Sequence, residues 1–202
     1  MNHRATNRNI MDGIDELMRG EVADISLVDP PWGEGNEKYW HTMLAKVDPL
    51  TSIKRPSHDA FLKQLMTLLY SHTKGMIFVV YGVRWRDELI RYASDAGLHS
   101  LAVVRGSYVR GPLDIHFLNK ENVELSEAYL QEVSEAQRKR GQKFPKVRVA
   151  IKPFATENGI LLDPCSGLGG YAKVAADAGM RYFGNEMNPA RYRRTVKAIE
   201  NL

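Results

Sequence analysis

The sequence predicts an α/β fold, a mostly parallel β-sheet with an antiparallel strand at an edge and helices on both faces. Short apolar runs alternate along the chain with stretches in which apolar residues recur every three or four positions. The chain has 202 residues, 44% hydrophobic and 26% charged, which suits one globular domain spanning residues 1–202. It contains no internal repeat and no low-complexity tract, so neither a fibrous nor a disordered protein fits.

Six segments have the composition of strands. Five are short apolar runs of the kind that a buried parallel sheet contains. The sixth, residues 113–118, alternates apolar and polar side chains and is therefore expected to be antiparallel or at an edge. The five apolar runs are residues 24–29, 75–81, 100–104, 159–163 and 181–186.

Four helices are predicted between these strands. Asp87 and Glu88 suit the first turn of the second helix, and Pro189 suits the first turn of the last. Gly97 and Gly179 are natural ends for the second and third. The predicted helices span about residues 57–72, 86–96, 170–178 and 189–201.

The composition of the chain indicates where in the cell the protein works and which partners its charge permits. A single cysteine, Cys165, excludes an intramolecular disulfide framework and a cysteine-rich zinc site, and the scattered histidines show no ligand spacing, so we expect no metal. The basic N-terminal residues lack an apolar segment behind them, and the longest apolar run, residues 76–83, is too short to span a bilayer. We therefore expect a cytoplasmic protein, in the host cytoplasm if it is phage-encoded. The net charge of +4 permits a polyanionic partner without requiring one.

The charge reverses sign after residue 137. Residues 121–137 contain five glutamates, and the following segment to residue 152 contains seven basic residues and no acidic one. A solvated helix followed by a charged loop is one interpretation, and a segment that contacts nucleic-acid phosphates is the other. Arg105 and Arg110, beside a predicted turn between strands, leave the same two interpretations open. The basic residues of the segment are Arg138, Lys139, Arg140, Lys143, Lys146, Arg148 and Lys152.

The motif Asp29-Pro30-Pro31-Trp32 follows a predicted strand. Two consecutive prolines fix φ and donate no backbone N–H, so the chain leaves the sheet as a stiff arm with unpaired carbonyls. A carboxylate, a carbonyl and an indole side by side suit a planar substrate with an exocyclic NH₂ group. The acceptors would take its two hydrogens and orient the nitrogen lone pair, and the indole would stack on its ring. A proline-rich turn with a core tryptophan is the alternative.

A second motif, Asp163-Pro-Cys-Ser-Gly-Leu-Gly-Gly170, joins a predicted strand to a predicted helix. Glu186 closes the next strand, 23 residues after Asp163, near the spacing of the ribose-binding acid in a nucleotide-binding β-α-β unit. The glycines do not have G-x-G-x-x-G spacing, and a carboxylate precedes them, which disfavours a pyrophosphate ligand. The pattern favours a nucleoside with a cationic group, with an ordinary strand–helix turn as the alternative.

The two motifs together resemble the amino-group DNA methyltransferases that use S-adenosylmethionine, in the class whose catalytic motif precedes the cofactor motif. Residues 8–33 resemble the N-terminal strand, acidic turn and catalytic loop of that class. Residues 151–199 resemble its lysine-proline element, cofactor loop and following helix-strand-helix. The resemblance implies the Rossmann-like sheet of class I methyltransferases and methylation of adenine N6 or cytosine N4 in DNA. Aspartate at position 29, where the cytosine enzymes usually have serine, favours adenine N6.

The resemblance also assigns roles to residues. Asp29 and the Pro30 carbonyl would bind the amine, within a loop that Pro31 stiffens, and Trp32 would stack on a flipped base. For S-adenosylmethionine, Glu186 would bind the ribose and Met187 would touch the adenine. The other residues expected to bind the cofactor are Asp12, Lys152, Asp163, Pro164, Cys165, Gly167 and Gly169. Residues 121–150 are the candidate target-recognition region, and Tyr39 and Trp40 could clamp the base or anchor their loop to the core.

The chain departs from the family pattern at two places. The glycine motif ends in Tyr171 where relatives have threonines, and only a few residues separate Lys152-Pro153 from the next strand, where relatives have a helix. Either the basic segment supplies that helix or the affinity for the cofactor is low. These departures leave a non-catalytic cofactor- or nucleic-acid-binding subunit as an alternative. A methyltransferase acting on RNA is another, because RNA adenine methyltransferases also have the Asp-Pro-Pro-Trp motif. The protein is expected to be a monomer or a homodimer. A nicotinamide-dependent oxidoreductase fits least.

Overall fold

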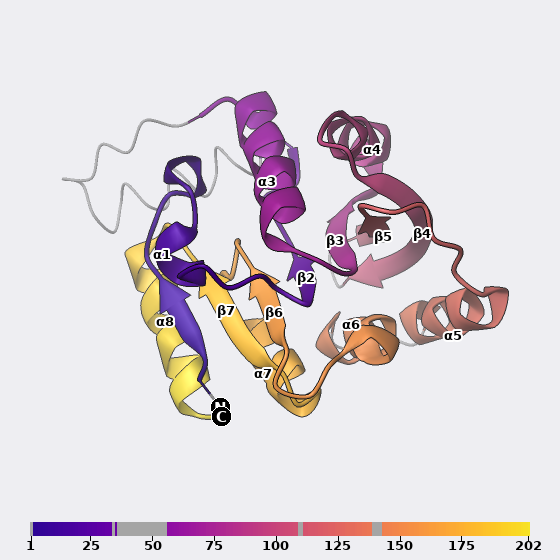
Figure 1. Cartoon of the computed structure of the whole chain (residues 1–202). Coiled ribbons are helices and arrows are strands. Elements are labelled where there is room, and N and C mark those ends of the chain that lie inside the picture. Colours follow the sequence, from indigo (N-terminus) through magenta and orange to yellow (C-terminus); the bar gives the residue numbers. More distant parts are fainter. Residues whose placement is uncertain (1, 34, 36–55, 109–110, 139–142) are drawn as a thin grey trace.

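A computed structural model describes residues 2–33, 35, 56–108, 111–138 and 143–202. Its centre is a seven-stranded sheet with the strand order β1-β7-β6-β2-β3-β5-β4 (Figure 1). The strands are β1 (Arg4–Thr6), β2 (Ile25–Val28), β3 (Ile77–Gly82), β4 (His99–Tyr108), β5 (Gly111–Asn119), β6 (Ile160–Asp163) and β7 (Arg181–Asn185). The helices are α1 (Asp15–Met18), α3 (His58–His72), α4 (Arg86–Asp95), α5 (Glu127–Arg138), α6 (Lys143–Ile151), α7 (Gly170–Asp177) and α8 (Pro189–Glu200), with 3-10 turns η1 (Ile10–Asp12), η2 (Val83–Trp85) and η3 (Lys152–Phe154).

The sheet is parallel from β1 to β3, and β5 is antiparallel to both of its neighbours, β3 and β4. The predicted α/β fold is confirmed, with one refinement. The antiparallel strand predicted at residues 113–118 lies one place in from the edge, and β4 forms the edge itself. We call the end of the sheet at which the parallel strands finish the carboxyl edge; β6 and β7 point toward it at the top of Figure 1.

The direction of the chain reverses between β6 and β2. From β2 the chain crosses through α3 to β3 on one side, and from β6 it crosses through α7 to β7 on the other. Right-handed crossovers in opposite directions place their helices on opposite faces of the sheet. The boundary between β2 and β6 is therefore the topological switch point, where ligands of open α/β sheets bind.

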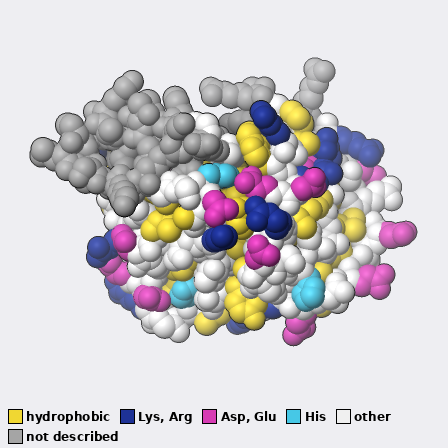
Figure 2. All heavy atoms as spheres, turned by 90° about the horizontal axis from the view of Figure 1, so that it is seen from above, with side chains coloured by type: hydrophobic (Ala, Val, Ile, Leu, Met, Phe, Trp, Pro, Cys, Tyr) yellow, Lys and Arg dark blue, Asp and Glu magenta, His cyan; other side chains and the backbone are white. Residues whose placement is uncertain are grey.

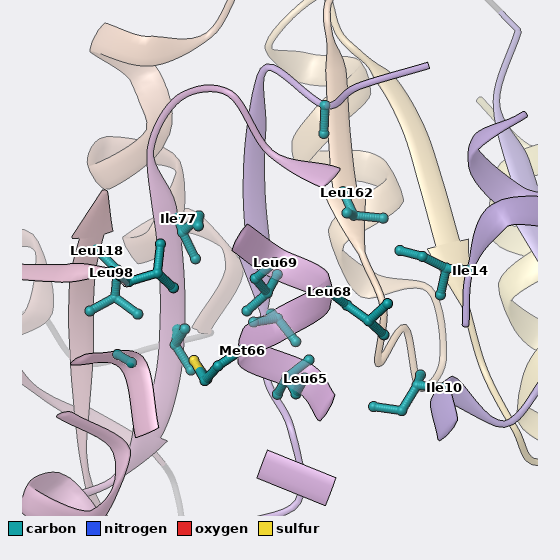
Figure 3. Close-up of a cluster of buried hydrophobic side chains, with 14 of the residues drawn as sticks. Ile10, Ile14, Leu65, Met66, Leu68, Leu69, Ile77, Leu98, Leu118 and Leu162 are labelled. Carbon is teal, nitrogen blue, oxygen red and sulfur yellow. The ribbon is translucent and has the colours of Figure 1, made fainter. Parts of the chain in front are cut away.

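Each face of the sheet has its own apolar core. One cluster joins α1, α3 and α4 to the sheet, and Figure 3 shows Leu65, Met66 and Leu69 of α3 among its members. The other cluster joins α5, α6 and α7 to the opposite face. The layers explain why the strand sequences are apolar on both sides.

Local signals at the helix ends agree with the prediction. The Ser57 side chain accepts a hydrogen bond of 3.1 Å from the backbone amide of Ala60 and begins α3. Asn188 caps α8 in the same way, and Pro189 occupies its first turn. Among the described residues, no helix is both long enough and apolar enough to cross a membrane.

The sequence did not predict β1 or α1, and it predicted a helix in the basic segment, where α6 lies, only as one of two alternatives. Strand β1 pairs with β7, and the Thr6 hydroxyl donates a 2.9 Å hydrogen bond to the Asn185 side chain. Helix α6 lies in the segment interpreted as a charged loop, and that interpretation is wrong for residues 143–151. Val147, Ala150 and Ile151 of α6 are buried in the core because their helical spacing turns them toward the sheet.

Candidate active site

The two sequence motifs follow neighbouring strands. Strands β2 and β6 pair directly, with Ile25 opposite Leu161 and Ser26 opposite Leu162. Asp29 follows β2, and Asp163 is the last residue of β6. The proline loop (residues 29–33) and the glycine loop (residues 163–169) therefore both leave the sheet at the switch point of the carboxyl edge.

The pKa values of two side chains, Tyr171 and Cys165, are raised by carboxylates of both loops. Burial raises the pKa of Tyr171 well above its usual range, and the carboxylates of Asp29 and Asp163 raise it further. Cys165 is partly exposed as a residue, yet desolvation of its thiol raises its pKa, with further contributions from Asp163, Glu186 and Asp29 and an opposing one from Arg191. The carboxylates of both motifs therefore act on the same two side chains, Cys165 and Tyr171.

The proline loop holds its own tryptophan in place. The Trp32 indole Nε1 donates a 3.1 Å hydrogen bond to Oδ1 of Asp29. Pro30 is buried, whereas Asp29, Pro31 and Trp32 are partly exposed. Trp32 packs against the apolar cores of both faces. The carboxylate and the indole are therefore oriented relative to each other and remain partly open to solvent.

Residues that the sequence did not single out support the loop from β3. The Gly33 amide donates a 3.4 Å hydrogen bond to the Tyr81 hydroxyl, which also lies 3.0 Å from Nε2 of His58. Gly33 has a φ of +70°, and a Cβ there would lie 2.5 Å from the Trp85 ring. Trp85 and Tyr81 come some fifty residues after the proline motif, so no local pattern reveals this contact.

The glycine loop is arranged around the buried carboxylate of Asp163, which is 1% exposed. Its Oδ2 accepts a 2.9 Å hydrogen bond from the Tyr182 hydroxyl, and its Oδ1 accepts a 3.3 Å bond from the Cys165 amide. Burial, followed by the charge of Asp163, raises the pKa of Tyr182 well above its usual range. The phenol therefore stays protonated and donates to the carboxylate.

Glu186 connects β7 to the glycine loop. Its Oε2 accepts a 2.9 Å hydrogen bond from the Gly167 amide, and its Oε1 accepts a 2.8 Å bond from the Asn188 amide. Burial raises the pKa of Glu186, against the lowering effect of Arg191. A Cβ added to Gly167 would lie 2.9 Å from Nη2 of Arg191, so this guanidinium lies over the glycine loop.

The N-terminal segment holds the backbone next to Glu186. The Asn7 amide group donates hydrogen bonds of 2.6 Å to the Glu186 carbonyl and 3.0 Å to the Met187 carbonyl. Met187 is partly buried. Asp12 is exposed in η1, directly after β1, so it lies beyond the carboxyl end of the sheet's outer parallel strand.

Lys152 does not join the site. It is exposed in η3, which precedes β6, and the loop after η3 leads to the amino end of that strand, opposite the carboxyl edge. A helix does lie beside this element: α6 directly precedes Lys152. Lys152 and Pro153 thus form a 3-10 turn that directly follows the C-terminal end of α6, a helix of the apolar core.

Helix α6 packs against α7. Arg148 of α6 forms an ion pair with Asp177, the last residue of α7. This ion pair links the basic segment to the helix that follows the glycine loop.

The residues predicted to contact nucleic acid lie in different environments, and some of them lie outside the described residues. Arg148 forms the structural ion pair just described, and Arg138 is exposed at the end of α5. Lys143 and Lys146 belong to α6, although their side chains are not among those described. Tyr39, Trp40, Lys139 and Arg140 lie outside the described residues. Within the described ranges, no group of three or more His, Cys, Asp or Glu side chains could hold a metal ion.

Solved structures share this arrangement of strands and helices. M1.HpyAVI in complex with SAM superposes with a TM-score of 0.64 at 14% identity and covers 100% of both chains. TTHA0409 from Thermus thermophilus, a candidate DNA modification methylase complexed with S-adenosyl-L-methionine, gives 0.62 at 15% identity over 99% of this chain and 94% of that one. PvuII DNA methyltransferase, which is cytosine-N4-specific, gives 0.60 at 12% identity over 97% and 86%.

The chain has the methyltransferase fold. No family model matches the sequence, and no curated protein matches it either. The likeness is therefore one of structure, at identities far below those that carry a function from one protein to another.

Proposed function

We propose that this protein transfers a methyl group from S-adenosylmethionine to the exocyclic amine of a base in DNA, with adenine N6 as the target. The observation that supports this most is the adjacency of Asp29 and Asp163 at the ends of β2 and β6. One loop carries groups suited to an amine and the other carries groups suited to a nucleoside cofactor. Two of the structural neighbours are complexes with the same cofactor.

The residues of the glycine loop fit S-adenosylmethionine. The Asp163 and Glu186 carboxylates can accept from an ammonium group and from ribose hydroxyls, and the Gly167 amide holds Glu186 in place by donating to it. Their negative charge suits a cationic sulfonium nucleoside. When bound, the cofactor supplies an electrophilic methyl group. Met187, Pro164, Cys165 and Gly169 would contribute the remaining surface of the cofactor site.

The proline loop would hold and activate the amine. The Asp29 carboxylate and the Pro30 carbonyl accept its two hydrogens, which leaves the nitrogen lone pair directed toward the glycine loop. Trp32 is fixed by its hydrogen bond to Asp29, so the indole presents a preset surface for the base. Catalysis would then depend on positioning and electrostatics. A base within a duplex cannot reach such a loop, so the target must flip out or be single-stranded.

The choice of adenine depends on the residue at position 29. The fold is shared with a cytosine-N4-specific enzyme and so favours neither base. Aspartate at position 29, where the resembling cytosine enzymes usually have serine, favours the adenine amine.

Incubation of the purified protein with labelled S-adenosylmethionine and mixed-sequence duplex DNA tests the proposal. We expect N6-methyladenine in the digested nucleosides, and less label in RNA of the same sequence. Asp29→Ala should reduce turnover by about 100-fold or more while leaving cofactor affinity nearly unchanged. Asp163→Ala should abolish cofactor binding in calorimetry. Asp95→Ala, at an exposed helix end away from both loops, is the matched control.

The results discriminate between the alternatives. N4-methylcytosine as the product would overturn the adenine assignment, and preferential labelling of RNA would overturn the DNA assignment. Cofactor binding without turnover on either nucleic acid would support a non-catalytic subunit.

A further inference from the structure

Two arginine side chains share one buried carboxylate beyond the proline loop. Oδ2 of Asp114 accepts a 2.8 Å hydrogen bond from Nε of Arg86, and Oδ1 accepts a 2.8 Å bond from Nε of Arg105. The Asp114 side chain is fully buried, whereas those of Arg86 and Arg105 are 36% and 54% exposed. The acceptor is hidden and the two donors reach the surface.

Asp114 is ionised in this arrangement. Burial opposes its charge, but the hydrogen bonds and charges of Arg86 and Arg105 outweigh burial and hold the pKa of Asp114 below its usual value. The hydrogen bond to Asp114 raises the pKa of Arg86 in turn. Two cations and one anion leave the group with one net positive charge.

Most of the donor capacity of the pair is unused. A guanidinium has five N–H groups, and each of these arginines spends only Nε–H on Asp114. Among the described residues, no acceptor is bonded to the Nη atoms of either arginine. A planar guanidinium with free Nη–H groups matches the geometry of a phosphate, and the shared carboxylate restricts its rotamers in advance.

The group lies beside the proline loop, on the side away from the glycine loop. Asp114 pairs across β3 and β5 with Tyr81, whose hydroxyl accepts from the Gly33 amide. Arg86 follows Trp85, the residue whose ring would meet a Cβ at Gly33. Along the carboxyl edge the order is glycine loop, proline loop, Arg86 and Arg105. Arg86 follows β3, the strand next to β2, Asp114 lies on β5, and Arg105 lies on β4. At a spacing of nearly 5 Å between strands, Asp114 is about 10 Å from β2.

We propose that Arg86 and Arg105, preset by Asp114, bind a backbone phosphate of the DNA strand that presents its base to Trp32. This inference rests on the proposed function. With the cofactor on the β6 side of the proline loop, the strand carrying the target base must leave on the β3 side. Its phosphodiesters then pass the two guanidiniums.

Acidic side chains near Arg86 and Arg105 reduce the positive potential around the two guanidiniums. Asp87 follows Arg86 and is exposed, and Glu88 lies 3.8 Å from His58. Arg84 lies over the Trp85 ring, 5.8 Å from its centroid. Figure 2, which views the molecule from above, shows basic and acidic side chains side by side around its centre. The arginine pair therefore acts by short-range hydrogen bonding to one phosphate, and a long-range positive field is not required.

Fluorescence anisotropy of labelled DNA tests this, with S-adenosylhomocysteine present and NaCl varied. Arg86→Gln and Arg105→Gln should each weaken duplex binding about tenfold and lower the slope of log Kd against log salt by about 0.9. Arg194→Gln removes an equally positive, exposed side chain from α8 on the opposite face and should change neither quantity beyond the general effect of one charge. Asp87→Asn leaves the Asp114 bonds intact and should tighten binding, because it removes a repulsion from the phosphate.

The readouts separate this inference from the proposed function. Wild-type protein could bind DNA with a salt dependence that needs both arginines and yet fail to methylate it. This result would support the phosphate site and refute the proposed methyltransferase activity. Normal methylation with Arg86→Gln and Arg105→Gln indistinguishable from Arg194→Gln would refute the phosphate site alone. Failure of wild type to bind DNA would refute both. Thermal unfolding and cofactor affinity show whether each variant is folded. If an arginine variant is unfolded, the DNA affinity of Asp87→Asn tests the phosphate site instead: tighter binding supports it, and unchanged binding refutes it.

Discussion

Oε2 of Glu186 accepts a 2.9 Å hydrogen bond from the Gly167 amide, so the carboxylate that follows β7 fixes the loop that follows β6. The other oxygen, Oε1, accepts from the Asn188 amide at the start of α8. The residue expected to bind the ribose therefore already organises the loop expected to bind the rest of the cofactor. Its orientation is set before any ligand arrives.

Glu186→Gln should weaken S-adenosylmethionine binding about tenfold or more. A neutral amide is a weaker acceptor than a carboxylate, and its NH₂ group would face the backbone amide of Gly167 or Asn188, which is itself a donor. Isothermal titration calorimetry measures the affinity directly. Glu200→Gln, at the exposed end of α8, removes the same charge far from the loop and serves as control. Equal affinities of the two variants would contradict the role assigned to Glu186.

Gly33→Ala should reduce turnover by about 100-fold and change cofactor affinity little. The backbone at Gly33 has a φ of +70°, and the new Cβ would lie 2.5 Å from the Trp85 ring, so the proline loop must move. Gly35→Ala is the matched control, because no atom of the described residues lies within 4 Å of a Cβ there. Steady-state kinetics of both variants, with cofactor titrations, make the comparison. Full activity in Gly33→Ala would show that the loop position does not matter for transfer.

The sequence predicts the sheet well because its strands are short apolar runs with clear boundaries. All six predicted strands are present, and the adjacency of the two motifs follows from the parallel topology that the helices between them require. Strand β1 escapes prediction because three residues, Arg4–Thr6, carry no periodicity, and pairing with β7 decides their conformation.

The sequence predicts helix α6 only as one of two alternatives, for a different reason. Val147, Ala150 and Ile151 have helical spacing, but the surrounding basic residues and Pro145 give the segment the composition of a solvated loop. The support of the proline loop by Tyr81 and Trp85 depends on contacts between residues about fifty positions apart. Such contacts are fixed by tertiary packing and leave no local pattern in the sequence.

Gly169→Ala should lower the free energy of unfolding by about 2–5 kcal/mol, the sum of left-handed backbone strain and overpacking. Gly169 has a φ of +75°, and its Cβ would lie 2.8 Å from Cα of Thr195 in α8. Gly20→Ala separates the two costs, because Gly20 has a φ of +80° and no atom in the described part of the chain lies within 4 Å of its Cβ. It should cost only the strain, about 1–2 kcal/mol. Urea unfolding gives both values, and equal losses would show that α7 and α8 tolerate a methyl group between them.

His116 should make the protein lose stability on mild acidification. It is fully buried on β5, between Val79 of β3 and Val103 of β4, and among the described residues neither ring nitrogen has a hydrogen-bond partner. Burial lowers its pKa to about 4, against a raising effect of Asp114 and a smaller lowering effect of Arg86. The unfolded chain therefore takes up a proton below about pH 6.5 that the folded chain refuses until about pH 4.

Stability should accordingly rise with pH between about 4 and 6.5 and be fully present above that range. At about 1.4 kcal/mol per pH unit, the wild type should lose about 2 kcal/mol between pH 7 and pH 5 through this residue. His116→Leu removes the titrating group and two unsatisfied nitrogens, so it should lack this loss and be at least as stable at pH 7. Urea unfolding at both pH values measures the difference, with His99→Leu, an exposed histidine of β4, as control. The same acid loss in wild type and His116→Leu would mean that the ring is protonated in the folded protein and has a partner there.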